Sequence, residues 1–349
     1  MHRAIYLATL LLTATPAAAA PPQATEQAAS PDAAALVAEI RRIIAERYVL
    51  PERRPALDAV LAEGLTTARY ATPDPVQLAE RINADLARVG QDKHLGLRVD
   101  QSAATPGPRR PGPFDPAAFT RQISQMNHGV RELRVLPGNV RVMTYDGFHH
   151  TGPESDQAID AALTFLSGGD AVIIDLRANG GGSVAAVQRL ISAFLPPETP
   201  LATFHMGGEP VETVNALGAG VVPRITNRPL YVLVSNTSAS AAEEFVGHVI
   251  GYRLGEVVGE TTAGAAFNNE IVPIDGGFVL SVSVGRPVLA STGGDWEATG
   301  FTPTRPTTAD AALNVAYSEA LTKLSEGAEG RDREQLMRLA RAAAAQVTN

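Results

Sequence analysis

Two short apolar runs, each followed by a corner of small residues and then by helical spacing, constrain the fold of this 349-residue chain most strongly. The runs cover residues 171–176 and 230–234. Each is short and uninterrupted, which is typical of a strand buried on both faces of a sheet. Apolar residues at helical spacing follow over 183–194 and 239–252. Repeated strand–loop–helix units predict an α/β fold with largely parallel strands.

Further elements lie on both sides of a proline-rich stretch. Before it, apolar spacing predicts a small bundle of three helices and then a strand, at 33–49, 57–65, 72–86 and 94–99. After it, the pattern predicts strands and helices at 140–144, 156–166, 271–274, 278–284, Val288, 310–323 and 333–343. The expected organisation is a signal peptide at 1–20, a disordered linker at 21–32, a helical bundle at 33–100, a Pro/Gly-rich linker at 101–118, an α/β domain at 119–325 and a C-terminal helix at 326–349.

The first 20 residues have the three-part plan of a secretory signal. Met1-His2-Arg3 is positively charged, an apolar run extends to Thr13, and alanines at 17–20 offer small residues to a signal peptidase. The apolar run has about ten residues, half of what a bilayer span needs. We therefore expect cleavage near residue 19 or 20, export to a periplasm or beyond the cell, and no stable insertion in a membrane.

Composition excludes several kinds of chemistry. The chain has no cysteine, which rules out disulfides, thiolate nucleophiles and iron–sulfur sites. Lys93 and Lys323 are the only lysines, and the formal net charge is −8, which argues against nucleic acid as a partner. Neither an H-E-x-x-H motif nor a cluster of acidic ligands occurs, so we expect no metal and no cofactor.

The first corner, DLRANGGG at 175–182, places three glycines between a strand and a helix. Glycine lets backbone N–H groups point at an incoming group, and a helix N-terminus adds positive potential. The corner therefore suits an oxyanion or a phosphate, although a tight turn without a ligand explains the same residues. It does not fit a dinucleotide fingerprint, and no Walker lysine follows.

The second corner, SNTSASAAEE at 235–244, contains four hydroxyl groups among small residues. Ser240 and Glu243 fit a capping box, and Thr237 and Ser238 are alternative helix caps. The alanines beside Ser240 leave its hydroxyl open to a substrate, and a helix start stabilises a nucleophile by ~0.3–1 kcal/mol. These residues fit a helix cap and a nucleophile equally well.

A serine nucleophile needs a base, and the candidates are two lysines and seven histidines. His94 is the candidate because it lies at the start of the strand predicted at 94–99, where the first domain closes. A packed core histidine fits that position as well.

The segments D-x-H-x-x-L at 92–97, DLRANGGG and SASAAE at 238–243, in this order, resemble the S41 peptidases. This family includes the C-terminal processing proteases, the tricorn core and the interphotoreceptor retinoid-binding protein modules. The resemblance spans residues 33–325. It implies a ClpP/crotonase-like core of ββα units, preceded by a small N-terminal helical bundle.

The resemblance also implies which branch of the family fits. Processing proteases pair the serine with a lysine at the position of Ala265, so that dyad is absent here. The residues before 175 leave no room for a PDZ domain. The tricorn-like and retinoid-binding-protein-like branch matches instead, and it implies Ser240 as nucleophile and His94 as base. The segment WEATGFTP at 296–303 implies Glu297 as the carboxylate, although a surface loop residue fits Glu297 too.

On the same pattern, the backbone N–H of Gly181 or Gly182, together with that of Ala241, holds the oxyanion. The implied activity is hydrolysis of protein or peptide substrates through an acyl-enzyme, with a Ser-His-Glu arrangement. Two positions depart from the pattern: Lys93 stands where tricorn-like members have serine, and Ala298 stands where the family has glycine.

Three other functions fit part of the sequence. A catalytically weak or inactive module of this fold could bind an apolar ligand or a peptide, a crotonase-like enzyme could act on acyl-CoA, and a structural envelope protein would need no chemistry. Reactive side chains at all three implied catalytic positions favour an exported serine endopeptidase. The substrate and the oligomeric state stay open.

Overall fold

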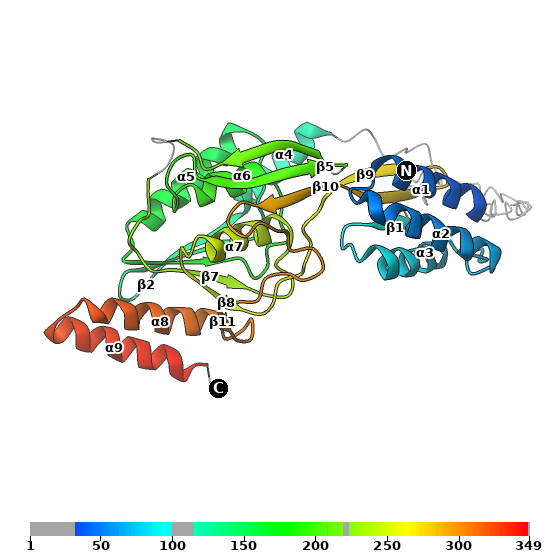
Figure 1. Ribbon diagram of the computed structural model, residues 1–349. Coiled ribbons are helices and arrows are strands. Elements are labelled where there is room, and N and C mark those ends of the chain that lie inside the picture. The colour runs from blue at the N-terminus through cyan, green and yellow to red at the C-terminus, as the bar shows by residue number, and fades with distance from the viewer. Residues whose placement is uncertain (1–31, 100–114, 208, 219–222, 348–349) are drawn as a thin grey trace, which may run out of the picture.

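The computed structural model describes residues 32–99, 115–207, 209–218 and 223–347 (Figure 1). The predicted signal peptide, the segment that follows it to residue 31 and most of the predicted linker lie outside these residues. Within the described ranges the strands form two sheets.

A six-stranded sheet is the centre of the α/β region, with strand order β11-β8-β7-β4-β3-β2. The strands are β2 Val130–Leu136, β3 Val140–Tyr145, β4 Ala171–Asp175, β7 Leu230–Val234, β8 Glu256–Gly259 and β11 Arg305–Pro306. All neighbours are parallel except the β2–β3 pair. The two apolar runs form β4 and β7, which are buried along their whole length, so the predicted α/β fold is confirmed.

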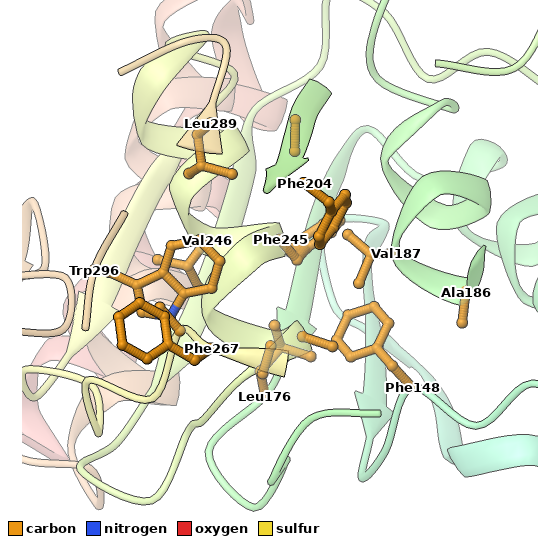
Figure 2. Packing of buried hydrophobic residues seen from close by; sticks show 14 of the residues in the cluster. Phe148, Leu176, Ala186, Val187, Phe204, Phe245, Val246, Phe267, Leu289 and Trp296 are labelled. Carbon is orange, nitrogen blue, oxygen red and sulfur yellow. The ribbon is translucent and has the colours of Figure 1, made fainter. Parts of the chain in front are cut away.

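Helices cover both faces of this sheet because successive strand side chains alternate in direction. On one face Ile174 and Val232 pack with residues of α5, α6 and α7, and on the other Ile173 and Leu233 pack with residues of α8 and α9. The helices are α5 Pro153–Ser167, α6 Val184–Ile191, α7 Ala241–Gly251, α8 Ala312–Glu326 and α9 Gly330–Ala345. In Figure 2, Phe245 on α7 lies among Phe148, Phe204 and Val187 in the first of these layers.

A second sheet connects the N-terminal helices to the rest of the chain. Its strand order is β1-β10-β5-β6, and β9 also pairs with β10. The strands are β1 Gly96–Val99, β5 Pro200–Met206, β6 Glu209–Asn215, β9 Asn268–Ile274 and β10 Phe278–Leu289. The first part of β10 pairs with β1, and its last part pairs with β5. The segments predicted as two strands at 278–284 and 288 are therefore one continuous strand.

The three predicted N-terminal helices are present as α1 Ala33–Arg47, α2 Arg54–Thr66 and α3 Pro75–Gly90. Asp32 and Asp74 cap α1 and α3, and each accepts two backbone N–H groups. α1 packs on α2 and α2 on α3, as the predicted small bundle requires. The bundle is joined to the second sheet, because β1 pairs with β10 and the Val49 N–H donates to the Ser283 carbonyl oxygen at 2.8 Å.

Several elements were not predicted: β2, β5, β6, β8 and the helix α4 Pro116–Gln125. Five of the seven residues of β6 are exposed, so the strand carries no alternating apolar pattern that could reveal it. α4 begins inside the predicted linker, at Pro116, because Asp115 caps it. None of the helices in the described part of the chain is long and apolar enough to cross a membrane.

Candidate active site

Three of the four hydroxyl groups in the second corner hold the two corners together. The buried Ser238 hydroxyl donates to the Leu176 carbonyl oxygen at 2.8 Å. Ser235 Oγ and Thr237 Oγ1 both donate to the Arg177 carbonyl oxygen, at 2.6 and 2.9 Å. These hydroxyls bind backbone in the neighbouring loop, which leaves Ser240 as the hydroxyl available for chemistry.

Ser240 lies at the N-cap of α7 in an unusual backbone conformation. The capping box with Glu243 is present, as the first of the two interpretations predicted. An ordinary N-cap residue has an extended backbone, whereas Ser240 has φ 55° and ψ −121°. Such a conformation costs on the order of 1–3 kcal/mol and is concentrated at functional sites. Capping therefore does not explain the backbone of Ser240.

The glycine corner lies directly against Ser240. A Cβ atom on Gly181, which has φ +105°, would lie 2.7 Å from the Ser240 Cβ. A Cβ atom on Gly182 would lie 2.2 Å from the Phe148 carbonyl oxygen. Glycine is required at both positions, by the close approach and by the positive φ.

The three backbone N–H groups expected to bind the oxyanion differ in whether they already have an acceptor. The Gly181 N–H already donates to Asn179 Oδ1 at 2.9 Å, so it is engaged in holding the loop. Asn179 is fully buried, and its Nδ2 donates to the Tyr145 carbonyl oxygen at 2.8 Å. Within the described ranges, no acceptor takes the N–H of Gly182 or of Ala241. This role of Asn179 was not predicted from the sequence, although the residue lies within the DLRANGGG corner at 175–182.

Glu243 is fully buried and does more than cap α7. Its Oε2 accepts the Ser240 N–H at 3.0 Å and the Ala265 N–H at 2.8 Å. Its Oε1 accepts the Thr262 hydroxyl at 2.6 Å and the Gly264 N–H at 2.7 Å. One carboxylate thus joins the serine corner to the loop 262–265.

Glu297 joins that loop to the candidate base. Its Oε2 accepts the N–H groups of Ala266 at 2.6 Å and Phe267 at 3.1 Å, and its Oε1 accepts the Lys93 N–H at 2.7 Å. Burial raises the pKa of Glu297, and the three amide hydrogen bonds oppose that shift. Through Glu243, the loop and Glu297, hydrogen bonds extend from Ser240 to the residue before His94.

The His94 ring lies between acidic groups. Asp92 Oδ1 accepts the N–H groups of His94 at 2.8 Å and Leu95 at 3.1 Å. Burial lowers the pKa of His94, while Asp92 and Glu243 oppose that shift, so the ring is neutral near pH 7 and able to accept a proton. Among the side chains that the structure describes, none forms a hydrogen bond with His94 Nδ1. Glu297 therefore reaches the backbone beside His94 and not its ring.

The two lysines take no part in this geometry. The Lys93 side chain is exposed, and Lys323 pairs with Glu326 on α8 at 2.6 Å. Ala265 occupies the position at which the resemblance would place a catalytic lysine.

A metal site is the other chemistry that these residues suggest. One ring nitrogen of His94 and one carboxylate oxygen each from Asp92 and Glu297 lie within 4.8 Å of one another. The Glu297 oxygens in this group also accept three backbone amides, so the carboxylate binds the surrounding backbone with no metal needed to hold it.

A cavity of about 530 Å³ lies near the glycine corner. It is lined by the start of α6, from Val184, by the β5–β6 hairpin, including Phe204 and Val214, and by Asn268. Val184 is two residues beyond Gly182, and Asn268 follows Phe267. Two walls of the cavity are therefore formed by residues that directly follow site residues in the sequence.

Two family models match the chain. The model of peptidase family S41 matches residues 138–307, and the model of the N-terminal domain of S41 peptidases in eukaryotic interphotoreceptor retinoid-binding protein matches residues 28–128. A carboxyl-terminal-processing protease of Synechocystis sp. is 32% identical over 119 residues, which are 34% of this chain and 27% of that relative. The match thus spans about a quarter of the length of the curated relatives.

Solved structures share the fold. A photosystem II D1 C-terminal processing protease superposes with a TM-score of 0.54 at 17% identity, covering 83% of this chain and 98% of that one. Mature CPAF superposes with a TM-score of 0.55 at 14% identity, covering 89% and 98%. At these identities the likeness extends to the fold alone.

Proposed function

This chain belongs to peptidase family S41, and from that premise we propose that it is an exported serine endopeptidase that uses Ser240, His94 and Glu297. Its substrates are proteins or peptides, as expected for this family. Export follows from the predicted signal at 1–20, and cleavage there releases a periplasmic or secreted protein.

The observation that carries the proposal is the state of Ser240. Its backbone is strained at the head of α7, and the amide of Ala241, which has no acceptor among the residues that the structure describes, follows it directly. The neighbouring hydroxyls bind the loop 176–177. A nucleophile on a sharp strand-to-helix turn beside free N–H groups is the arrangement that acyl transfer needs.

The proposed reaction has two steps, acylation of Ser240 and hydrolysis of the acyl-enzyme. Ser240 Oγ attacks the scissile carbonyl carbon while a ring nitrogen of His94 takes the hydroxyl proton, a role that contributes about 10²–10⁴-fold in rate. The N–H groups of Ala241 and Gly182 hold the oxyanion, and one such donor is worth about 2.7–4 kcal/mol. His94 then gives its proton to the leaving amine. A water molecule hydrolyses the acyl-enzyme by the same route.

Glu297 acts on the base through the backbone. By accepting the Lys93 N–H, it holds the loop from which His94 projects. By accepting two amides of the loop 265–267, it holds the same loop that Glu243 binds from the other side. The carboxylate therefore positions the backbone beside His94 and the loop beside Ser240, and the described contacts give it no hydrogen bond to the ring.

A serine-directed fluorophosphonate probe, with peptide mapping, tests the proposal. The probe should label Ser240, and Ser240→Ala should abolish both labelling and hydrolysis of an unfolded protein. His94→Ala should lower both by about 10²-fold or more, and the double variant should lose little beyond that, since the residues act as a unit. Thr237→Val is the matched control, because it removes a nearby hydroxyl that binds the Arg177 carbonyl oxygen and the Ser235 hydroxyl. Full labelling of Ser240→Ala would refute the proposal.

The cavity of about 530 Å³ favours a second candidate function, a non-catalytic module that binds an apolar ligand or a peptide. Phe204 and Val214 give this cavity apolar walls, and its size is within the usual range of ligand pockets. Under this alternative the probe labels no serine in the folded wild type, while a peptide binds and protects the cavity from exchange.

A further inference from the structure

The two acidic residues beside His94 differ in how much of their hydrogen-bonding capacity is free. Glu297 uses both oxygens for three backbone amides. Asp92 uses Oδ1 for two backbone amides, while its Oδ2 is buried and has no partner among the described residues. Glu297 Oε1 accepts one amide and could accept one more hydrogen bond, whereas Asp92 Oδ2 accepts none among the described residues and is the freer of the two oxygens.

Asp92 Oδ2, His94 Nδ1 and the Tyr48 hydroxyl are buried atoms with no hydrogen-bond partner at ordinary distance among the described residues. Asp92 lies beside both other residues, because it acts on the pKa of Tyr48 and one of its oxygens is within 4.8 Å of a ring nitrogen of His94. The three atoms are complementary, because the carboxylate oxygen accepts two hydrogen bonds while the hydroxyl and a protonated Nδ1 each donate one. A buried polar atom without a partner costs about 1–3 kcal/mol, so small side-chain rotations that join these atoms are favourable. Catalytic hydrogen bonds are commonly long in the absence of substrate.

Two helix ends bring these groups together. Tyr48 is the C-cap of α1 and is fully buried. Gln91, the C-cap of α3, is in the left-handed conformation, which turns the chain so that Asp92 and His94 follow at once. An oxygen of Asp92 and a ring nitrogen of His94 lie within 4.8 Å of each other. The proximity of Tyr48 to Asp92 also contributes to raising the pKa of the tyrosine, after burial.

We propose that Asp92, rather than Glu297, is the carboxylate that orients the His94 ring, and that Tyr48 holds Asp92 in turn. The inference rests on the proposed function, since it concerns the base of the same site. Asp92 Oδ2 accepts a hydrogen bond from the Nδ1–H, which leaves the other ring nitrogen free to take the Ser240 proton. The Nδ1 proton stays on the ring throughout, and the carboxylate offsets the charge that His94 gains.

The surrounding charges fit this assignment. The charged groups around the ring are Asp92, Glu243 and Glu297. At Tyr48, Asp92 raises the pKa of the hydroxyl and Arg53 lowers it. Asp92 is the first of the two acids that oppose the lowering of the His94 pKa by burial. Removing its charge should therefore lower the pKa of His94 further.

The test compares Asp92→Asn with wild type by NMR of ¹⁵N-histidine-labelled full-length protein, with His94 assigned through His94→Gln. Asparagine keeps an oxygen for the His94 and Leu95 amides, but its NH₂ group replaces Oδ2 and cannot accept a hydrogen bond from the Nδ1–H. In wild type at pH 7 the proton should be on Nδ1. In Asp92→Asn the Nδ1–H tautomer should lose population, the pKa of His94 should fall, and probe labelling of Ser240 should slow by about 10²-fold. Tyr48→Phe should shift each readout in the same direction by less.

Asp85→Asn is the matched structural control. Asp85 is buried on α3 and accepts the Tyr70 hydroxyl at 2.7 Å, so it is a second tyrosine–aspartate pair in the same helices. Asp85→Asn should lower stability without changing the His94 tautomer. The inference is wrong if Asp92→Asn behaves like Asp85→Asn, or if Glu297→Gln and not Asp92→Asn moves the tautomer. A wild type that neither labels nor hydrolyses would overturn the proposed function instead, while the tautomer comparison would still decide the role of Asp92.

Discussion

Replacing Glu243 with glutamine should unfold the protein at a much lower denaturant concentration. The buried carboxylate accepts four hydrogen bonds, two on each oxygen. Glutamine keeps one acceptor oxygen and replaces the other with an NH₂ group, so two donors lose their partner whichever way the amide lies. Each buried donor left without an acceptor costs about 1–3 kcal/mol, which predicts a loss of about 2–6 kcal/mol for Glu243→Gln. Domains are typically stable by only 5–15 kcal/mol.

The neighbouring residue provides a matched control. Glu244 is also buried and lies on the same helix; its Oε1 has no hydrogen-bond partner among the described residues and lies 3.7 Å from His248 Nε2, a contact that a glutamine oxygen can keep. The same chemical change at Glu244 should therefore cost about 1 kcal/mol or less. Urea unfolding monitored by circular dichroism measures both variants, with a common m-value as the check that only stability has changed.

A second readout connects Glu243 to the site. Because Oε2 holds both the Ser240 and the Ala265 amides, Glu243→Gln should also slow probe labelling of Ser240 in the folded fraction, whereas Glu244→Gln should not. If Glu243→Gln and Glu244→Gln lost equal stability and kept equal labelling, the assigned role of the four hydrogen bonds would be incorrect.

Three further predictions follow from the same geometry. Gly181→Ala should lower labelling of Ser240 by at least tenfold, because the added Cβ would lie 2.7 Å from the Ser240 Cβ. Gly180→Ala should keep the labelling rate, because its Cβ would have no neighbour within 4 Å. Equal labelling rates of the two variants would refute the close packing. Burial lowers the pKa of His94 below its ordinary 6.5, so kcat/KM for a peptide should be lost as pH falls only below 6.5, and a midpoint above 6.5 would contradict that burial. Full-length protein expressed in a bacterium should be recovered from the periplasm or medium without its first 19 or 20 residues, as intact mass would show, and an uncleaved cytoplasmic product would disprove export.

Local patterns in the sequence determined the class of fold. The continuous apolar runs predict β4 and β7, and the amphipathic spacing predicts α1, α2, α3, α5 and α7, because strand and helix periodicities depend on residues close in sequence. The exposed strand β6 and the short strand β8 carry no such pattern. The pairing of β10 with both β1 and β5 has no local signature, since the partners are about 180 and about 80 residues away.

The site divides in the same way. Local residue patterns indicated where a nucleophile, a base and free amides could occur, but the same patterns fitted a helix cap, a tight turn and a packed histidine. The long-range contacts of the folded chain show which hydroxyls bind backbone and what each carboxylate binds. The corner 235–244 has three more hydroxyl side chains besides Ser240, and these bind backbone in the neighbouring loop: Ser235, Thr237 and Ser238. Glu297 contacts the backbone of Lys93, 204 residues away, because a buried carboxylate takes whichever donors the folded chain brings to it.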